Sequence, residues 1–472
     1  MAFNSFVFLL LFFVALLPLQ RALSRRGEIH PSRALLLVAS LGFYAWGRPG
    51  NLFFLAGSIL FNFTVAQRLD SSANQEQKRR WFILGVIVNL GFLAVFKYTG
   101  FAFSTLEGLT GLHLPAPGLP PILGISFFTL QQVMYLFDCF EGLAEPHGLL
   151  DHASFVAFFP YLISGPLVRS RQVIRHLREA RGADGEALGR GLFLFAFGLA
   201  KKVVLADGLA KLADAGFSQA GQISGLEALL ASVFYTLQIY FDFSGYSDMA
   251  LGLARMLGVP LPLNFNSPFR ATSMTEFWQR WHISLSAFIT TYLYTPLVRS
   301  MGRATLAVSV VATLLAMTIA GLWHGPSWTF VFFGVVHGLG LALNQVWRKR
   351  IKLRVPTALA WLLTMATVVF AFIFFRSPSM AAGWSMVARM GQIHHWARVE
   401  AFRAVLRLSD LPVLGPGLLL AMPCALLGPT SNEWAERFRP GIGSVLLVSA
   451  LLLISFLFMN STLGQSFVYF AF

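Results

Sequence analysis

The chain consists of long apolar runs separated by short polar or basic segments. Apolar runs of roughly 17 to 25 residues recur from end to end, and a helix of that length crosses the hydrocarbon core of a bilayer. The runs are continuous rather than alternating, which favours helices over a transmembrane barrel. The pattern predicts an all-α integral membrane protein with roughly 10–12 spans. We place these spans near residues 4–20, 34–47, 51–67, 81–97, 121–140, 191–206, 226–250, 304–322, 326–346, 357–375, 409–427 and 441–459.

Two segments differ from ordinary spans. Residues 155–166 are apolar but short, and Pro166 closes them, so they are predicted to form a re-entrant segment buried within protein. Residues 167–181 have helical periodicity with a basic side and an apolar side, which is typical of a helix lying in the membrane interface. The basic side carries Arg171, Arg175 and Arg178, and the apolar side carries Val173, Ile174 and Leu177.

Composition supports the membrane assignment and limits the possible partners. The chain is 56% hydrophobic and only 12% charged, whereas a soluble protein carries about 25% charged residues. The net charge of +15 could suggest nucleic acid as a partner, but the basic residues gather in short segments between apolar runs. This is the positive-inside pattern of cytoplasmic loops, so nucleic acid is not predicted as a partner and membrane lipids are. The same loops could attract an anionic cofactor such as coenzyme A.

The loops are too short to hold a soluble domain, and the chain shows no internal repeat of the transporter kind. We therefore predict one polytopic membrane domain over residues 1–472, with a catalytic core at about 120–345.

One candidate functional histidine lies in "FWQRWHISLS", residues 277–286. Ser273 and Glu276 fit a capping box that opens a helix, and Glu276 can pair with Arg280 at i, i+4. In a continuous helix Trp278 and His282 would project from one face. Alternatively, His282 is an interfacial histidine bonded to a carbonyl group.

The second candidate is His324 in "GLWHG", residues 321–325. It follows a long apolar run and precedes Pro326, which ends or restarts a helix. Gly321 and Gly325 leave the backbone open beside the ring, so a substrate could approach closely. A satisfied core histidine is the alternative. His337, in "VVHGLG", is better explained by packing or by support of another residue.

Two histidines within a membrane protein suit proton transfer. Ionisable side chains there are costly and usually functional, and imidazole titrates near neutrality. One histidine can take a proton from an attacking hydroxyl, while the other donates to a developing oxyanion or orients the first. No metal is predicted, because His282 and His324 lack Asp, Glu or Cys at familiar ligand spacing. A serine hydrolase is unsupported, because the chain has no G-x-S-x-G elbow.

At these residues the chain resembles the membrane-bound O-acyltransferase (MBOAT) family, especially its bacterial alginate O-acetyltransferase branch. The matching segments occur in order along nearly the whole chain. They are "ILGISFFTLQQVMYLFDCF" (122–140), "FFPYLISGPLVRS" (158–170), "IYFDFSGYSDMALGLARMLG" (239–258), "NFNSPF" (264–269), "EFWQRWHISLS" (276–286), "YLYTPL" (292–297), "GLWHGPSWTFVFFGVVHG" (321–338), "FFRS" (374–377) and "FVYFAF" (467–472).

The resemblance implies a multi-spanning helical bundle around a central catalytic funnel or tunnel. It implies an O-acetyltransferase of the bacterial inner membrane that takes acetyl from cytoplasmic acetyl-coenzyme A, with no permanently bound cofactor. The acetyl group would reach an exported polysaccharide of the alginate or cellulose type through extracytoplasmic partner proteins. By motif match, His324 takes the position of the catalytic histidine and His282 that of the second polar residue.

Further site residues follow from the same resemblance. Candidates for contacts with acetyl-coenzyme A are Trp278, Arg280 and Trp323. Candidates for lining the cavity, as substrate contacts or supports, are Asp242, Ser244, Tyr246 and Asp248.

The chain departs from the branch after the tryptophan–histidine segment. An Arg-Asp pair is expected ahead of "YLY" and a Gly-Gly turn after "PL". The chain instead has Thr290 and Thr291, and then Val298, Arg299 and Ser300. These departures leave the donor side and the final acceptor open.

Other functions remain as alternatives. The chain could transfer D-alanine to teichoic acid or acetyl to peptidoglycan, which keeps the chemistry and changes the substrates. A transporter of a glycan or lipid precursor and a catalytically silent export scaffold are less favoured. The first lacks the expected repeat symmetry, and the second would not need both histidine motifs.

Overall fold

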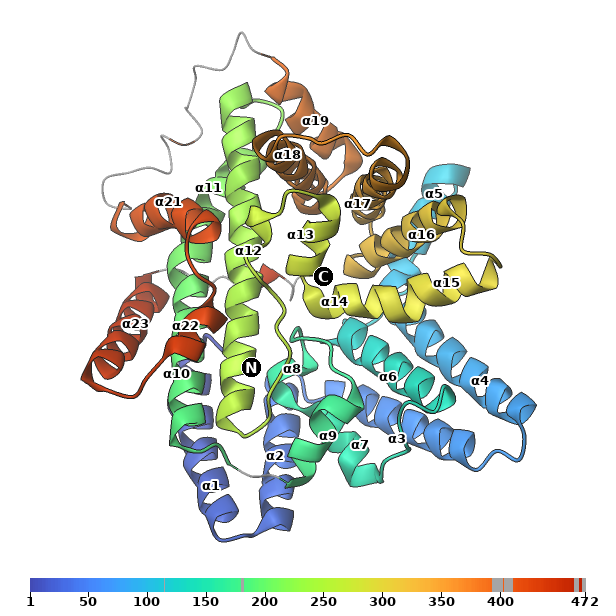
Figure 1. Cartoon of the computed structure of the whole chain (residues 1–472), viewed down its shortest axis with the longest axis vertical. Coiled ribbons are helices and arrows are strands. Elements are labelled where there is room, and N and C mark those ends of the chain that lie inside the picture. Colours follow the sequence, from blue (N-terminus) through green and yellow to red (C-terminus); the bar gives the residue numbers. More distant parts are fainter. Residues whose placement is uncertain (114, 180–181, 393–401, 403–410, 462–466, 469–472) are drawn as a thin grey trace. The chain divides into compact units, whose positions relative to one another are not determined.

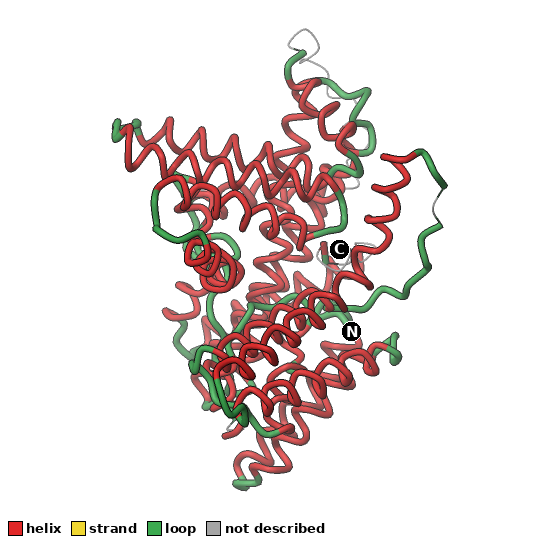
Figure 2. Tube along the Cα trace, turned by 90° about the vertical axis from the view of Figure 1, so that its right-hand side faces the viewer, coloured by secondary structure: helices red, strands yellow, loops and turns green. Residues whose placement is uncertain are grey.

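The computed structural model describes residues 1–472 except 114, 180–181, 393–401, 403–410, 462–466 and 469–472. Within the described residues every regular element is a helix, and Figure 2 shows helices joined by loops. This confirms the predicted all-α fold class. Internal contacts divide the chain into two compact units. The first comprises Met1–Phe195, Asp248–Pro262 and Phe438–Gly441, and the second comprises Ala196–Ser247, Leu263–Arg437 and Ile442–Phe472. The single domain over residues 1–472, with a core at about 120–345, stays a prediction.

The helices up to residue 217 begin with a π-helical turn (Figure 1). In three places helices follow one another without a loop, over residues 7–25, 75–110 and 185–217. In chain order they are η1 (Val7–Phe12), α1 (Phe13–Arg25), α2 (Ile29–Ala45), α3 (Asn51–Asp70), α4 (Gln75–Leu93), η2 (Ala94–Tyr98), α5 (Thr99–Thr110), α6 (Ile125–Phe140), α7 (Leu149–Ala157), α8 (Phe159–Leu162), α9 (Ser170–Glu179), α10 (Gly185–Ala200), η3 (Lys201–Ala206) and α11 (Asp207–Phe217).

The remaining helices include the long α12 and the hairpin of α16 and α17 (Figure 1). In chain order they are α12 (Gly225–Met256), η4 (Pro268–Arg270), α13 (Met274–Arg280), α14 (Ile283–Phe288), η5 (Ile289–Tyr294), α15 (Thr295–Ser300), α16 (Leu306–His324), α17 (Trp328–Val346), η6 (Trp347–Ile351), α18 (Thr357–Arg376), α19 (Met380–Met390), α21 (Leu411–Leu426), α22 (Ser431–Arg437) and α23 (Ile442–Ser461).

Seven of the described helical stretches are long and apolar enough to cross a membrane, which makes this a multi-pass membrane protein. They are Val7–Arg25, Asn51–Asp70, Gln75–Thr110, Leu306–His324, Trp328–Ile351, Thr357–Arg376 and Ile442–Met459, and each coincides with a predicted span. The other predicted spans also fall on helices, namely α2, α6, α10 with η3, α12 and α21. Residues 409–410 of the span predicted near 409–427 lie outside the described residues.

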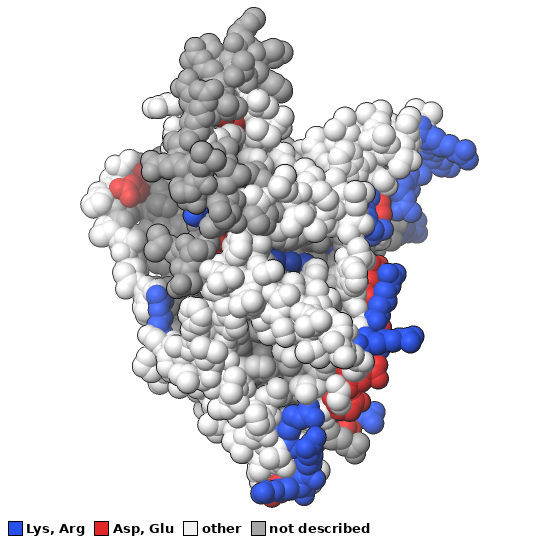
Figure 3. Space-filling model, turned by 90° about the vertical axis from the view of Figure 1, so that its left-hand side faces the viewer, with Lys and Arg blue, Asp and Glu red and all other residues white. Residues whose placement is uncertain are grey.

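The outward faces of these helices carry large apolar side chains. On α18, Leu362 and Leu363 are 56% and 57% exposed, and on α23 Val445 is 64% exposed. Such exposure would be a liability in water, whereas lipid acyl chains solvate it. Figure 3 agrees, because wide areas of the visible surface carry neither basic nor acidic side chains and the basic ones gather in clusters.

Polar side chains within the first unit are paired between helices. The amide nitrogen of Asn62 on α3 donates to Asn89 Oδ1 at 3.1 Å, and the amide nitrogen of Asn89 on α4 donates back to Asn62 Oδ1 at 2.7 Å. Both side chains are buried. Reciprocal amide bonds of this kind hold apolar helices together where burial alone gives no preference.

The helix predicted in 167–181 is confirmed as the amphipathic α9, while its place in the membrane interface stays a prediction and residues 180–181 lie outside the described residues. Its residues Val173, Ile174 and Leu177 are buried, as predicted, while its arginines lie on the other side. Asp151 on α7 accepts hydrogen bonds from Arg33 on α2 and from Arg178 on α9, the latter at 2.7 Å. Before α9, residues 155–168 are all buried, as a re-entrant segment requires.

The hairpin of α16 and α17 packs closely through glycines. A Cβ on Gly321 would lie 2.4 Å from the Phe330 carbonyl oxygen, and one on Gly334 would lie 2.3 Å from the Met317 carbonyl oxygen. No side chain fits at such separations, so these glycines allow backbone-to-backbone contact as small residues do in membrane helix pairs. The hairpin carries His324 at the end of its first helix.

Candidate functional site

His324 is the last residue of α16, and the helix ends there as the sequence predicts. Gly325 is extended, and α17 begins after Ser327, which caps it by accepting from the Thr329 amide. The imidazole is 5% exposed. The rings packed around it include those of Trp323, at 5.0 Å between centroids, Phe375, at 5.4 Å, and Phe333, at 5.9 Å.

The glycines beside His324 do not open a substrate path, contrary to the expectation from the sequence. Gly321 faces the backbone of α17, and a Cβ on Gly325 would lie 2.2 Å from the ring of Phe330. Both positions are occupied by protein, so these two glycines serve the packing of the hairpin.

His282 does not continue the helix that Ser273 opens, so the prediction that Trp278 and His282 share one helical face is wrong. Helix α13 ends at Arg280, Trp281 is extended, and α14 begins at Ile283. His282 lies between the two helices in the left-handed region, with φ 44° and ψ 53°. That conformation is unfavourable for a residue with a Cβ and persists only where surrounding contacts impose it, often at functional sites.

Asn264 supplies the contacts that impose it. Its backbone carbonyl accepts from the Ile283 amide at 2.9 Å. Its side-chain Oδ1 accepts from the Ser284 amide at 3.2 Å and the Ser284 hydroxyl at 2.8 Å, and lies 3.2 Å from His282 Nδ1. Its amide nitrogen donates to Ser247 of α12 at 3.3 Å. One asparagine thus draws the chain out of the helical path and orients the imidazole.

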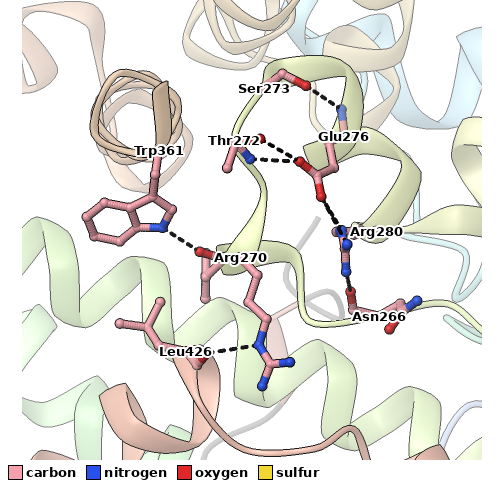
Figure 4. Close-up of polar contacts among 9 residues, drawn as sticks. Asn266, Arg270, Thr272, Ser273, Glu276, Arg280, Trp361 and Leu426 are labelled. Atoms are coloured by element: carbon pink, nitrogen blue, oxygen red, sulfur yellow. Dashed lines mark hydrogen bonds and ion pairs between the residues drawn. The ribbon is translucent and has the colours of Figure 1, made fainter. Parts of the chain in front are cut away.

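The capping box that opens α13 is confirmed in part (Figure 4). Ser273 accepts from the Glu276 amide at 3.1 Å, and Glu276 pairs with Arg280 at 2.9 Å. The Glu276 carboxylate reaches back to the amide and hydroxyl of Thr272, at 2.8 and 3.0 Å, rather than to the Ser273 amide. Burial opposes ionisation of Glu276, but the Thr272 hydrogen bonds and the Arg280 charge outweigh it and lower the pKa of Glu276. Arg280 also donates to the Asn266 carbonyl at 3.2 Å.

The loop ahead of α13 is also held from outside (Figure 4). The indole of Trp361 on α18 donates to the Phe269 carbonyl at 2.8 Å. The Arg270 guanidinium donates to the Leu426 carbonyl at 2.8 Å and the Gly428 carbonyl at 2.6 Å, at the end of α21. These contacts fix the loop that carries Asn264 toward His282.

The structure brings the two predicted histidines together. Their ring centroids lie 6.5 Å apart, and the ring of Phe243 on α12 meets His282 edge-on at 4.7 Å. His282 is fully buried, and burial lowers the pKa of its imidazole to about 3, so it is neutral at ordinary pH. Because Asn264 Oδ1 is an acceptor, neutral His282 carries its proton on Nδ1 and presents a lone pair at Nε2.

A cavity of about 790 Å³ lies beside this site within the second unit. Its wall comes from α13, α14, η5, α16, α17 and η6. The wall is rich in hydroxyl and amide side chains, includes the cations Arg348 and Lys349, and contains no carboxylate among its lining residues. Two π-helical turns, η5 and η6, contribute to it, and such turns are frequent at functional sites.

The cavity lies along the face of α16 that leads to His324. Ser309, Thr313 and Met317 line it. His324 follows Met317 by seven residues on the same face, about two turns or 10 Å farther along the axis. The two cations come from the opposite end of the α16–α17 hairpin. A ligand held at the basic end would therefore extend along α16 toward His324.

The three residues predicted to contact acetyl-coenzyme A do not all line the cavity. Trp278 lines the cavity, but Arg280 and Trp323 are not among its lining residues. Arg280 pairs with Glu276, and Trp323 packs beside both imidazoles. Donor binding by these residues stays a prediction.

The departures from the branch pattern fall partly on the cavity. Thr290 and Thr291, on η5, line it with neutral hydroxyl groups. Val298 to Ser300 lie at the end of α15 and are not among its lining residues.

The polar residues predicted on α12 do not line this cavity. Asp242 accepts an ion pair from Lys202 of η3 at 2.6 Å, and Lys202 also pairs with Asp207 at 2.7 Å. Asp242 further accepts from the Val468 amide at 2.9 Å. Ser244 is buried, and the Tyr246 ring packs at 4.9 Å on Phe467.

Asp248 is buried and belongs to the first unit. Within the part of the chain that the structure describes, no group of three or more His, Cys, Asp or Glu side chains could hold a metal ion.

Two contributors to the site were missed at the sequence level, and so was the lysine that pairs with Asp242. Asn264 and Phe243 lie inside motifs that carry the resemblance, yet nothing in the sequence pairs them with His282. Lys202 carried a signal that could have been used, because a lysine pair within the apolar run at 191–206 is costly in a membrane protein and demands partners.

The chain is similar to known membrane-bound enzymes over most of its length. The model of the MBOAT, membrane-bound O-acyltransferase family, matches residues 122–387. The chain is 36% identical over 385 residues to a peptidoglycan O-acetyltransferase of Helicobacter pylori, covering 75% of this chain and 73% of that protein. It is 38% identical over 410 residues to the probable alginate O-acetylase AlgI of Pseudomonas aeruginosa, covering 86% and 77%. A teichoic acid D-alanyltransferase of Streptococcus thermophilus is 31% identical over 242 residues, covering 49% and 58%.

Proposed function

This chain belongs to the membrane-bound O-acyltransferase family and is a membrane-bound O-acyltransferase, and we propose that it acetylates an exported polysaccharide. The acetyl group comes from acetyl-coenzyme A on the cytoplasmic side and crosses the membrane within the protein. The observation that carries the proposal is the pair of buried imidazoles, 6.5 Å apart, beside a face of α16 that also lines a basic cavity. The names of the similar proteins support O-acetyl transfer to alginate or peptidoglycan.

The composition of the cavity supports a coenzyme A thioester as donor. Its anionic phosphates suit the end with Arg348 and Lys349, and its amide-rich arm suits a wall of hydroxyl and amide groups. The lining residues include no carboxylate, so none of them repels the phosphates. In this arrangement the arm follows α16 from the basic end, and the thioester reaches toward His324.

The distance between the imidazoles supports a hydroxyl bound between them. With ring centroids 6.5 Å apart, two ring nitrogens can approach no closer than about 4 Å, beyond the 2.7–3.2 Å of a direct hydrogen bond. A single hydroxyl oxygen of the acceptor substrate fits in that gap, with its one proton directed at His324. His324 takes its proton, and the oxygen attacks the thioester carbonyl carbon. The carbon–sulfur bond then breaks, and the proton passes to the departing thiolate.

The position of the proton on neutral His282 decides between the two roles predicted for it, which are donating to an oxyanion and orienting the other histidine. Neutral His282 has its proton on Nδ1, toward Asn264, so its Nε2 accepts and cannot donate to an oxyanion. Because the hydroxyl gives its one proton to His324 and the ring nitrogens lie too far apart for a direct bond, the geometry supports a role in which the His282 ring bounds the space that the acceptor oxygen occupies.

The site of action and the partners complete the proposal. The enzyme works in the bacterial inner membrane, where the basic loops mark the cytoplasmic side. An extracytoplasmic acetyltransferase or accessory protein of a polysaccharide export system receives the acetyl group. The molecule that carries labelled acetyl first shows whether a protein hydroxyl or a sugar is the first acceptor.

Membranes containing the protein, supplied with acetyl-coenzyme A labelled in the acetyl group, test the proposal. Wild-type membranes should acetylate the exported glycan or a partner protein, and His324→Ala should abolish the transfer. His113→Ala is the matched control, because that histidine is exposed on the loop after α5 and should leave transfer unchanged. Normal transfer by a stably inserted His324→Ala variant would refute the proposal. If the membranes transfer D-alanine from a D-alanyl carrier and no acetyl, the proposed substrates are wrong and the acyl-transfer chemistry still holds.

A further inference from the structure

A third buried histidine, His337, contacts the wall of the cavity through a tryptophan. The indole nitrogen of Trp278 on α13 donates to His337 Nδ1 on α17 at 3.2 Å, and the two rings meet nearly perpendicular at 5.2 Å. His337 is fully buried, and Trp278 is 6% exposed and lines the cavity.

The direction of this hydrogen bond follows from the chemistry of the two groups. An indole N–H can only donate, so His337 Nδ1 must offer a lone pair. His337 is therefore neutral and carries its proton on Nε2. An imidazolium has protons on both nitrogens and could not accept, so the bond exists only with this tautomer.

The bond adds a directional constraint to a buried side chain. Helix α13 has only seven residues and ends in the break at Trp281 and His282, so contacts with neighbouring helices add to those within it. A second contact ties α13 to α17, because the Thr275 amide donates to Asn344 Oδ1 at 3.1 Å. The His337 bond sets the plane of the indole, which is the surface that the cavity presents.

His337 also touches the neighbourhood of the proposed base. Its ring lies 4.4 Å from that of Phe333, and Phe333 lies 5.9 Å from the ring of His324. A continuous chain of packed rings within the second unit therefore joins the cavity wall to His324.

We propose that His337 is a positioning residue for the acyl donor: by accepting from Trp278 it holds the indole as the wall against which the thioester arm lies. This inference rests on the proposed function, because it needs the cavity to hold the donor. It assigns His337 no contact with the reacting atoms. Its effect should appear in the KM for the donor more than in kcat.

Two amide substitutions separate positioning from packing. In His337→Asn the side-chain oxygen lies near the place of Nδ1 and can still accept from Trp278, whereas in His337→Gln the oxygen lies nearer to Nε2. The KM for acetyl-coenzyme A should rise about 2- to 10-fold in His337→Gln, as expected for one lost hydrogen bond. It should stay close to the wild-type value in His337→Asn. Trp278→Phe, which removes the donor, should raise the KM as His337→Gln does, and the double variant should add little.

The thermal midpoint of each variant, measured in detergent, provides the structural control. A purely structural role would lower the midpoint of His337→Gln and leave the KM unchanged, and that result would overturn the inference. Equal KM values for His337→Asn and His337→Gln would also overturn it. A wild-type protein that transfers nothing from acetyl-coenzyme A would instead refute the proposed function, and the inference with it.

Discussion

Removing the charge of Lys202 should destabilise the second unit strongly. The Lys202 ammonium lies 2.7 Å from Asp207 Oδ1 and 2.6 Å from Asp242 Oδ1, and these side chains are 2–3% exposed. In Lys202→Met, a substitution of similar length, two carboxylates remain buried without a cation. Both carboxylates are buried away from water, so neither can be hydrated in place of the lost ion pair.

The magnitude follows from the burial. Removing one partner of a buried ion pair costs about 3–5 kcal/mol, because the other partner stays charged and desolvated. The Val468 amide, which donates to Asp242 at 2.9 Å, offsets a small part of this. For a unit of this size about 1 kcal/mol shifts the midpoint by roughly 2–4 °C, so Lys202→Met should lower it by about 6–20 °C.

The assay is thermal unfolding in detergent followed by intrinsic fluorescence, with wild type and variants at equal concentration. The triple variant Lys202→Met, Asp207→Asn, Asp242→Asn serves as the control. It removes all three charges, keeps the shapes nearly constant and should recover most of the lost stability, since neutral replacements of buried ion pairs are often tolerated.

Two results would refute this reasoning. A Lys202→Met midpoint within about 2 °C of wild type would mean that the carboxylates are not desolvated as the structure places them. A triple variant as unstable as the single variant would mean that packing of the lysine stem, and not charge, stabilises this cluster.

Three further substitutions test the site and the hairpin. Asn264→Leu should cost about 1–3 kcal/mol for each buried donor left without its acceptor and should lower kcat, measured by unfolding and acetyl transfer; unchanged kcat would show that Asn264 does not orient the imidazole. Arg348→Glu with Lys349→Glu should raise the KM for acetyl-coenzyme A at least tenfold at low salt, while Arg350→Glu, which does not line the cavity, should change it little. Gly334→Leu should abolish stable insertion, measured as folded protein recovered from membranes; a well-folded variant would contradict the close helix contact.

Much of the fold could be predicted because membrane helices are locally determined. A continuous apolar run has to satisfy its own backbone bonds, so its helix follows from its composition without reference to distant contacts. The Ser273 cap and the end of α16 at His324 were likewise readable, since both depend on residues within a few positions. The prominence of His282 and His324 followed from the cost of placing imidazoles in apolar surroundings.

The rest depends on contacts that the sequence does not display. The helix pattern over residues 274–288 continues without a breaking residue, and the chain leaves it at His282 beside contacts from Asn264, which lies outside that pattern. Similarly, Asp242 looked like a substrate contact within its motif, but Lys202 lies 40 positions earlier and takes its carboxylate. The local sequence pattern indicates which secondary structure a segment prefers. The break at His282 and the partner of Asp242 are instead determined by hydrogen bonds and ion pairs between residues far apart in the sequence.

The reciprocal bonds between Asn62 and Asn89 have a consequence for biogenesis. Each amide nitrogen also donates within its own helix, but neither helix can enter the acyl-chain region alone without an unsatisfied side-chain oxygen, and each asparagine supplies the donor that the other lacks. Helices α3 and α4 should therefore leave the translocon as one preassembled pair, with the short polar loop between them still outside the lipid.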